Sequence, residues 1–109
     1  MAKIVSREEF SEIRKQLRQE GKKVGLCHGV FDLVHPGHIT HFREAKNMVD
    51  ILVVSVTAGK YVRKGPGRPY FNDTVRMNFL SELACIDYVI LSESFTADDV
   101  IETIEPDFY

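Results

Sequence analysis

All four histidines of this 109-residue chain lie in one short stretch, from His28 to His41. The stretch joins an apolar, strand-like run to an amphipathic, helix-like run. His35 and His38 are three residues apart, so both rings would lie on one side of the first turn of that helix. Helix N-terminal N–H groups and imidazole donors favour anionic oxygens, above all those that gain charge in a phosphoryl-type transition state. The spacing therefore predicts phosphate chemistry at this turn.

Two glycines flank the histidines and would let a ligand approach the main chain. Gly29 follows the first expected strand, and Gly37 lies at the start of the helix. The competing interpretation is a zinc site, with ligands drawn from Cys27, His28, His35, His38 and His41. Glycines at a strand–loop–helix junction favour phosphate, so we predict no metal held by protein ligands.

A second cluster of charge lies in the glycine- and proline-rich segment 59–69. Arginine forks and mobile lysines there could close over phosphates, and the residues concerned are Lys60, Arg63, Lys64 and Arg68. Arg76 is expected one turn into the following helix, where a cation opposes the helix dipole. Because that placement is unfavourable for stability alone, we expect Arg76 to contact an anion.

The elements that must position these residues alternate between helix and strand. The expected strands are 24–27, 51–56 and 88–91, with the start of a fourth at 107–109. The expected helices begin after Ser6, near Pro36, near Asn72 and after Thr96. The third helix should turn Val75, Phe79, Leu80 and Leu83 inward. This alternation predicts an α/β fold with a parallel sheet and right-handed crossovers.

Composition limits the class of protein. The length fits one domain, 1–109. A net charge of −2 with both signs mixed gives no basic surface for nucleic acid or a membrane. There is no apolar run long enough to span a bilayer and no signal-peptide pattern, so we expect a soluble cytoplasmic protein. Cys27 and Cys85 are expected to be buried free thiols.

The run from Gly29 to His38 resembles the fingerprint of the cytidylyltransferase-like nucleotidyltransferases. These enzymes join a phosphorylated small molecule to a nucleoside triphosphate and release pyrophosphate. The resemblance covers roughly Lys22 to Tyr109 and implies a Rossmann-like three-layer sandwich with a parallel sheet. The run from Lys64 to Asn72 is similar to a segment of sugar-phosphate adenylyltransferases, including heptose 1-phosphate adenylyltransferases.

The resemblance also implies roles for individual residues. His35 and His38 match the two motif histidines, which contact triphosphate oxygens and stabilise the pentacovalent α-phosphorus. Lys46 matches a helix lysine that can reach phosphates. The nucleotide-binding positions implied by the family are Gly29, Val30, Phe31, Asp32, Gly37 and Arg76. Of these, Asp32 would mainly order the loop as an Asx-turn residue. Mg²⁺ would arrive with the nucleoside triphosphate.

The function implied is transfer of AMP from ATP to a sugar phosphate. One alternative is a cytidylyltransferase that uses CTP and a polyol or alcohol phosphate. The alternative of another class is a nucleotide-binding module without turnover. The family continues past the fourth strand, so the resemblance implies a domain incomplete at its C-terminus. A homodimer would cover the sheet edge that this leaves.

Overall fold

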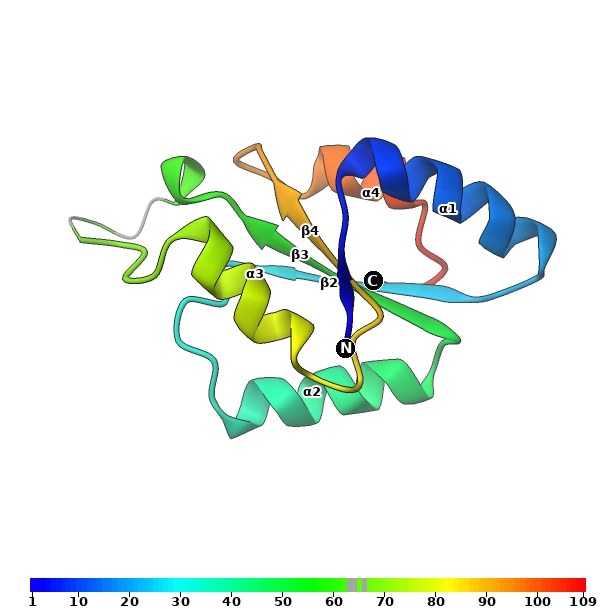
Figure 1. Ribbon diagram of the computed structural model, residues 1–109, viewed down its shortest axis with the longest axis horizontal. Coiled ribbons are helices and arrows are strands. Elements are labelled where there is room, and N and C mark those ends of the chain that lie inside the picture. Colours follow the sequence, from blue (N-terminus) through cyan, green and yellow to red (C-terminus); the bar gives the residue numbers. More distant parts are fainter. Residues whose placement is uncertain (63–64, 66) are drawn as a thin grey trace.

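The protein forms one parallel sheet with helices on both faces (Figure 1). The structure, a computed structural model, describes residues 1–62, 65 and 67–109. The strands are β1 (Lys3–Ile4), β2 (Val24–Gly29), β3 (Ile51–Thr57) and β4 (Tyr88–Ser92). Their order across the sheet is β1-β4-β3-β2, and every pairing is parallel. The carboxyl ends of β2, β3 and β4 therefore lie at one edge, where open α/β sheets bind ligands.

In the described part of the chain, four α-helices cover the sheet, two on each face. They are α1 (Arg7–Gln19), α2 (Pro36–Asn47), α3 (Asp73–Ser81) and α4 (Asp98–Ile104), and a short 3-10 helix, η1 (Gly59–Tyr61), follows β3. One apolar cluster joins α1 and α4 to the sheet, and the other joins α2 and α3 to its opposite face. The three layers confirm the predicted α/β sandwich of Rossmann-like type. None of the helices in the described part of the chain is long and apolar enough to cross a membrane.

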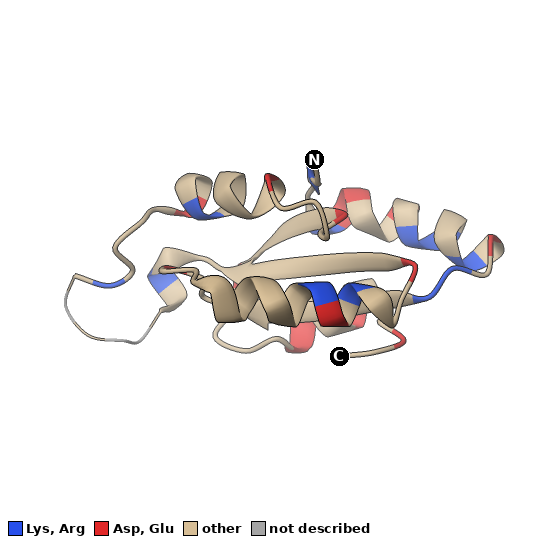
Figure 2. Cartoon of the chain, turned by 90° about the horizontal axis from the view of Figure 1, so that it is seen from below, with Lys and Arg blue, Asp and Glu red and all other residues tan. Residues whose placement is uncertain are grey.

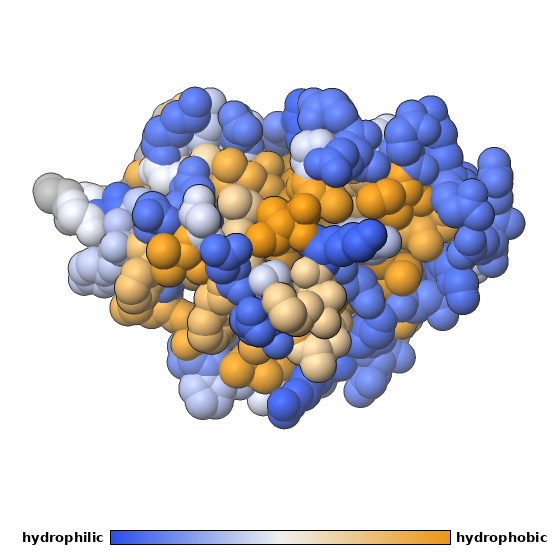
Figure 3. All heavy atoms as spheres, in the orientation of Figure 1, coloured by the Kyte–Doolittle hydropathy of each residue, from blue (hydrophilic) through white to orange (hydrophobic). Residues whose placement is uncertain are grey.

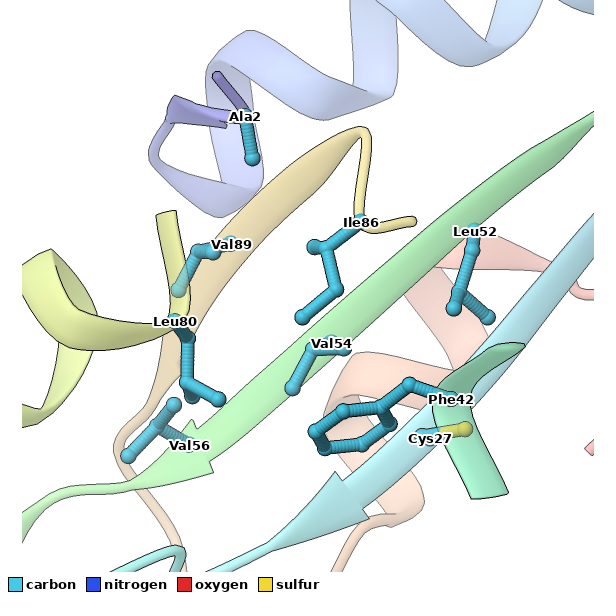
Figure 4. Packing of buried hydrophobic residues seen from close by; sticks show 9 residues of the cluster. All are labelled: Ala2, Cys27, Phe42, Leu52, Val54, Val56, Leu80, Ile86 and Val89. Carbon is cyan, nitrogen blue, oxygen red and sulfur yellow. The ribbon is translucent and has the colours of Figure 1, made fainter. Parts of the chain in front are cut away.

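The sheet forms because its strands are apolar on both sides. β3 is buried from Leu52 to Thr57, as a central parallel strand should be. Figure 4 shows the cluster on the α2 and α3 face, where Phe42 of α2 and Leu80 of α3 meet Val54 of β3. In Figure 2, charges of both signs lie on helices and loops, and β2, β3 and β4 carry none. Figure 3 shows hydrophobic residues across the centre of one face with hydrophilic residues bordering them.

Two helix starts, at Ser6 and Asn72, have the predicted caps, whereas α4 begins after Ala97 with no side-chain cap and not at a Thr96 cap as expected. The side chain of Ser6 accepts a hydrogen bond from the Glu9 N–H at 3.0 Å, and Glu9 returns one to the Ser6 N–H at 3.0 Å, which confirms the capping box. Asn72 caps α3 through the N–H of Val75 at 2.8 Å. Gly21 takes the left-handed conformation after α1, with φ of 71°.

Two expectations about the elements are wrong, and a third holds in part. The two-residue strand β1, which was not expected, precedes α1 and pairs with β4. Cys85 is only partly buried. The segment 107–109 begins to pair beside β2 as expected, but only through a parallel bridge from Phe108 to Gly25.

The inward face of α3 also differs from the prediction. Val75 and Phe79 are 46% and 49% exposed, whereas Arg76 and Leu80 are buried. A nine-residue helix has room for one narrow buried stripe, and here a guanidinium occupies part of it.

Candidate functional site

The predicted phosphate site lies at the turn between β2 and α2. His35 is the N-cap residue of α2, and its Nδ1 accepts a hydrogen bond from the N–H of Gly37 at 3.0 Å. The Nδ1 of His38 accepts one from the main-chain N–H of His35 at 3.1 Å. A ring nitrogen that accepts carries no proton, so each neutral imidazole holds its proton on Nε2. The helix cap thereby leaves two Nε2–H groups as donors at the helix N-terminus.

The two rings are close enough to influence each other. Their centroids are 4.1 Å apart with an angle of 49° between planes. Burial lowers the pKa of His38 below its ordinary value, and the neighbouring His35 and His41 lower it further. The lowered pKa favours the neutral form of His38 near pH 7, in which Nε2–H is an uncharged hydrogen-bond donor.

Two glycines are required by the packing of this turn. A Cβ on Gly37 would lie 2.7 Å from Cε1 of His35. A Cβ on Gly29 would lie 2.9 Å from Cζ of Phe31. Both distances are too short for a real contact, so neither ring could keep its place beside any other residue. Glycine is therefore needed at both positions to leave space for the rings of His35 and Phe31.

Phe31 holds the turn in an uncommon conformation. Its φ is 51°, in the left-handed region that non-glycine residues rarely adopt. Its ring packs edge-on against Phe42 at 5.3 Å and against His38 at 6.0 Å between centroids. Such strain persists only where surrounding contacts fix the backbone, and it is common at functional sites.

Asp32 ties the histidine turn to the glycine- and proline-rich segment. Its carboxylate accepts the N–H of Tyr70 at 2.6 Å and that of Phe71 at 2.9 Å. Burial acts to raise the pKa of Asp32, but these two bonds and the charges of Arg76 and Arg68 outweigh it, so its pKa lies below the ordinary value. Asp32 therefore orders the loop, but across 38 residues of sequence and not as an Asx turn.

Arg76 is held by groups of the protein itself. It is 2% exposed, and its guanidinium donates to the carbonyl oxygens of Val30, Thr57 and Phe71 and to the carboxylate of Asp73, at 2.6–3.0 Å. These bonds occupy all three of its nitrogens. Arg76 thus contacts an anion, as expected, but that anion is the Asp73 carboxylate of the protein itself, and no nitrogen of the guanidinium is left for a nucleotide. Arg76 fixes the turn after β2 to the end of β3.

Lys46 is likewise placed away from the histidines. Its Nζ donates to the Asp50 carbonyl and to Oδ2 of Asp87, both at 2.6 Å. Those partners precede β3 and β4, so Lys46 lies at the amino ends of the strands. Eight residues of helix separate it from His38, which is roughly 12 Å along the axis. The structure does not bring Lys46 to the site, contrary to expectation.

The described part of the glycine- and proline-rich segment 59–69 is connected to the histidine turn through Tyr70, the residue that follows it. The guanidinium carbon of Arg68 lies 4.2 Å from the centre of the Tyr70 ring, and the N–H of Tyr70 is bound by Asp32. Lys60 is exposed and lies 5.3 Å from the centre of the Tyr61 ring. Arg63 and Lys64 lie outside the described residues.

The zinc alternative finds no support in the described residues, where no group of three or more His, Cys, Asp or Glu side chains could hold a metal. Cys27 contacts His41 across 3.8 Å between Sγ and Nε2. Burial raises the pKa of this thiol to about 11, with the neighbouring Cys85 adding to the effect, which keeps it protonated and a poor ligand.

Sequence reasoning considered His28 only as a zinc ligand and missed its partners. Its Nδ1 lies 2.6 Å from Oγ of Ser55, and its Nε2 lies 3.4 Å from Oγ1 of Thr57. His28 comes two residues before the turn, and both hydroxyls come from β3. The signal available was the pair of hydroxyls in an otherwise apolar strand.

Comparison with known proteins agrees with this geometry. A family model described as "Cytidylyltransferase-like" matches residues 26–109. The "Bifunctional protein HldE" of Syntrophotalea carbinolica is 35% identical over 108 residues, covering 97% of this chain and 22% of that protein. The protein of the same name from Paramagnetospirillum magneticum is 40% identical over 108 residues, again covering 97% and 22%. The chain therefore spans 22% of the length of these relatives.

A solved structure has a similar fold. It is described as the crystal structure of the lipopolysaccharide core biosynthesis protein from Thermoplasma volcanium GSS1. The TM-score is 0.73 at 32% sequence identity, and the match covers 80% of this chain and 71% of that one.

Proposed function

Since residues 26–109 match its family model, the chain belongs to the cytidylyltransferase-like nucleotidyltransferases, and we propose that it transfers AMP from ATP to a sugar phosphate with release of pyrophosphate. The observation that carries the proposal is the pair of Nε2–H donors on His35 and His38 at the N-terminus of α2. Neutral imidazole donors beside the positive end of the helix dipole suit the oxygens of a triphosphate.

The reaction needs no covalent intermediate on the protein. An oxygen of the acceptor phosphate attacks the α-phosphorus, the new P–O bond forms, and the bond to the β-phosphate oxygen breaks so that pyrophosphate leaves. Negative charge builds on the phosphoryl oxygens as the bonds exchange. His35 and His38 would donate hydrogen bonds to those oxygens, and their contacts with the nucleotide are part of the proposal.

Magnesium fits this site as a partner of the nucleotide. The carboxylate of Asp32 is engaged with two main-chain N–H groups, and the described residues contain no cluster of metal ligands. Mg²⁺ keeps several waters and is commonly held by substrate phosphates. Bound in that way, it would neutralise triphosphate charge, while the protein supplies donors from the histidines.

The choice of ATP and a sugar phosphate rests on the segment Lys64 to Asn72, which resembles that of sugar-phosphate adenylyltransferases. The neighbour's title, which names lipopolysaccharide core biosynthesis, agrees with a sugar phosphate acceptor. The nucleoside triphosphate and the phosphorylated small molecule are the partners we propose.

A matrix of substrates tests the proposal. Pyrophosphate release would be measured with magnesium, using ATP or CTP against sugar, polyol and alcohol phosphates. We expect turnover with ATP and a sugar phosphate, and loss of turnover on chelation with EDTA. Turnover with CTP and a polyol phosphate alone would replace the proposed substrates. Saturable nucleotide binding without turnover in any pair would contradict transfer and identify a binding module.

A further inference from the structure

We propose that His28 is a positioning residue that acts, through Thr57, on the strained turn holding the phosphate site. The proposal rests on the proposed function for its effect on catalysis, because that function gives the turn its role. His28 lies outside the fingerprint from Gly29 to His38, and its side chain reaches the motif only through β3.

Three side chains form a continuous chain of contacts at the carboxyl ends of β2 and β3. Ser55 is fully buried, with its Oγ 2.6 Å from Nδ1 of His28. Oγ1 of Thr57 lies 3.4 Å from Nε2 of His28 and donates to the carbonyl oxygen of Gly29 at 3.4 Å. We call Ser55, His28 and Thr57 the β2–β3 relay. It ends on the residue that opens the turn.

The contact of Thr57 with the Gly29 carbonyl favours one tautomer of His28. If the one hydroxyl proton of Thr57 is given to that carbonyl, Thr57 accepts from the ring. The proposal therefore places the proton of His28 on Nε2 and has Nδ1 accept from the hydroxyl of Ser55. Burial lowers the pKa of His28, against a smaller opposing effect of the Asp99 charge, which keeps the ring in this neutral state.

Thr57 joins the relay to a second support of the same turn. Its main-chain oxygen accepts from Arg76 at 2.7 Å, and the same nitrogen of Arg76 donates to the Val30 carbonyl at 2.9 Å. The Gly29 and Val30 carbonyls are thus held from two sides, immediately before Phe31 with its φ of 51°. The β2–β3 relay supplies one of the hydrogen bonds that hold the main chain before Phe31 and so stabilise its left-handed conformation.

Nuclear magnetic resonance tests the relay without any assay of activity. In the wild-type protein at pH 7.5 we expect the ¹⁵N shifts of His28 to show a proton on Nε2 and none on Nδ1. We expect His28→Ala and Thr57→Val to reduce the left-handed population of Phe31, as measured by backbone couplings. Thr103→Val is the matched control, since it removes a hydroxyl that donates to the Asp99 carbonyl in α4 at 3.0 Å. A proton on Nδ1, or a Phe31 unchanged in both variants, would overturn the proposal.

Kinetics then measure what the positioning contributes. We expect His28→Ala and Thr57→Val each to lower kcat/KM for pyrophosphate release about tenfold, and the double variant to lose about tenfold and not a hundredfold. His28→Gln, which keeps a neutral donor, should recover most of the loss of His28→Ala. Additive losses in the double variant would show that the two residues act separately and overturn the relay.

The NMR and kinetic experiments distinguish a failure of this proposal from a failure of the proposed function. If the wild-type protein released no pyrophosphate with any substrate pair, the proposed function would fail, and the tautomer of His28 and the conformation of Phe31 would still decide the relay. If turnover is found and His28→Ala matches the wild type, the relay fails and the proposed function stands.

Discussion

Each site histidine uses its two ring nitrogens for different purposes. In His35 and His38 the Nδ1 atom accepts a main-chain N–H and completes the start of α2. The Nε2 atom is left with its proton as a donor. The helix cap therefore sets the tautomer of both rings before any ligand binds, which is the preorganisation that transition-state stabilisation requires.

His38→Ala tests the site at the level of one side chain. We expect pyrophosphate release to fall at least about a hundredfold, the scale seen when a preorganised donor is removed. The circular dichroism spectrum should be unchanged, because His38 is partly exposed in the first turn of α2. Thr40→Ala, at an exposed position of the same helix, is the matched control. Turnover of His38→Ala at the wild-type rate would show that the phosphate site is elsewhere.

Gly37→Ala tests the fit between the main chain and the His35 ring. The added Cβ would lie 2.7 Å from Cε1 of His35 and push the ring off its cap. A displacement on the order of 1 Å can lower turnover about a hundredfold, and we expect a loss of that size in kcat/KM. The account would be wrong here if Gly37→Ala kept wild-type kcat/KM while a structure of the variant showed a displaced His35.

The pH dependence of stability follows from His28 and His38. Burial is the main reason that both pKa values lie below the ordinary value, about 6.5. Below about pH 6.5 the unfolded chain binds protons that the folded chain does not bind. The contribution of the two histidines to the free energy of unfolding is therefore fully present above about pH 6.5 and is lost as the pH falls towards the pKa values of the folded state. We expect the Tm to drop between pH 7 and pH 5, and less steeply in His28→Gln. Equal slopes for variant and wild type would exclude His28 as a contributor.

Among the elements, α3 supports the site mainly through one buried cation. Arg76 connects α3 to the carbonyl oxygens of Val30 and Thr57, while Asp73 balances its charge across 2.6 Å. Asp73 also accepts the N–H of Gly59 at 2.8 Å, which fixes the start of η1. The loops after β2 and β3 are thereby held to the start of one helix.

Removing that cation should cost stability as well as function. We expect Arg76→Met to lower the free energy of unfolding by about 3 kcal/mol, because the variant leaves buried carbonyl oxygens and Asp73 without their donor. Urea denaturation would measure the change, with Arg43→Met at an exposed position of α2 as control. A decrease in the free energy of unfolding no larger than that of the control would contradict this prediction and show that water can replace the guanidinium without loss of stability.

The sequence predicts the elements well where a local signal is strong. The capping box at Ser6, the cap at Asn72 and the apolar run of β3 are local, and the structure has all three elements within a residue or two of the expected bounds. β1 was missed because two residues carry no periodicity, and only pairing with β4 makes them a strand. The exposure of Val75 and Phe79 was missed because a pattern of apolar residues does not show how much of a short helix the sheet can cover.

The site itself was predictable in part for the same reason. The histidine turn lies within a few consecutive residues, so its placement at a strand–helix junction could be read from spacing. The other partners of Arg76 and Lys46 could not be predicted because they are distant in sequence: Val30 and Thr57 for one, Asp87 for the other. The relay through Ser55 and Thr57 needed the register of β2 against β3, which spacing does not give.

At the scale of the whole molecule, the two edges of the sheet carry different groups. The carboxyl edge bears the His35 and His38 donors, the strained Phe31 and the segment held by Asp32. At the amino edge Asp87 binds Lys46 and the N–H of Leu52. The structural ion pair and the proposed chemistry are therefore separated by the length of the strands, and the proposed nucleotidyl transfer would take place at the carboxyl edge.

The most direct measurement follows the α-phosphate. ATP labelled at the α-phosphorus would be incubated with magnesium, the protein and a sugar phosphate, with His38→Ala in parallel. The account predicts that the label moves into an adenylylated sugar, that unlabelled pyrophosphate forms in equal amount, and that His38→Ala suppresses both. Label that stays in ATP, or that appears as free AMP with no sugar adduct, would contradict nucleotidyl transfer to a sugar phosphate by this chain.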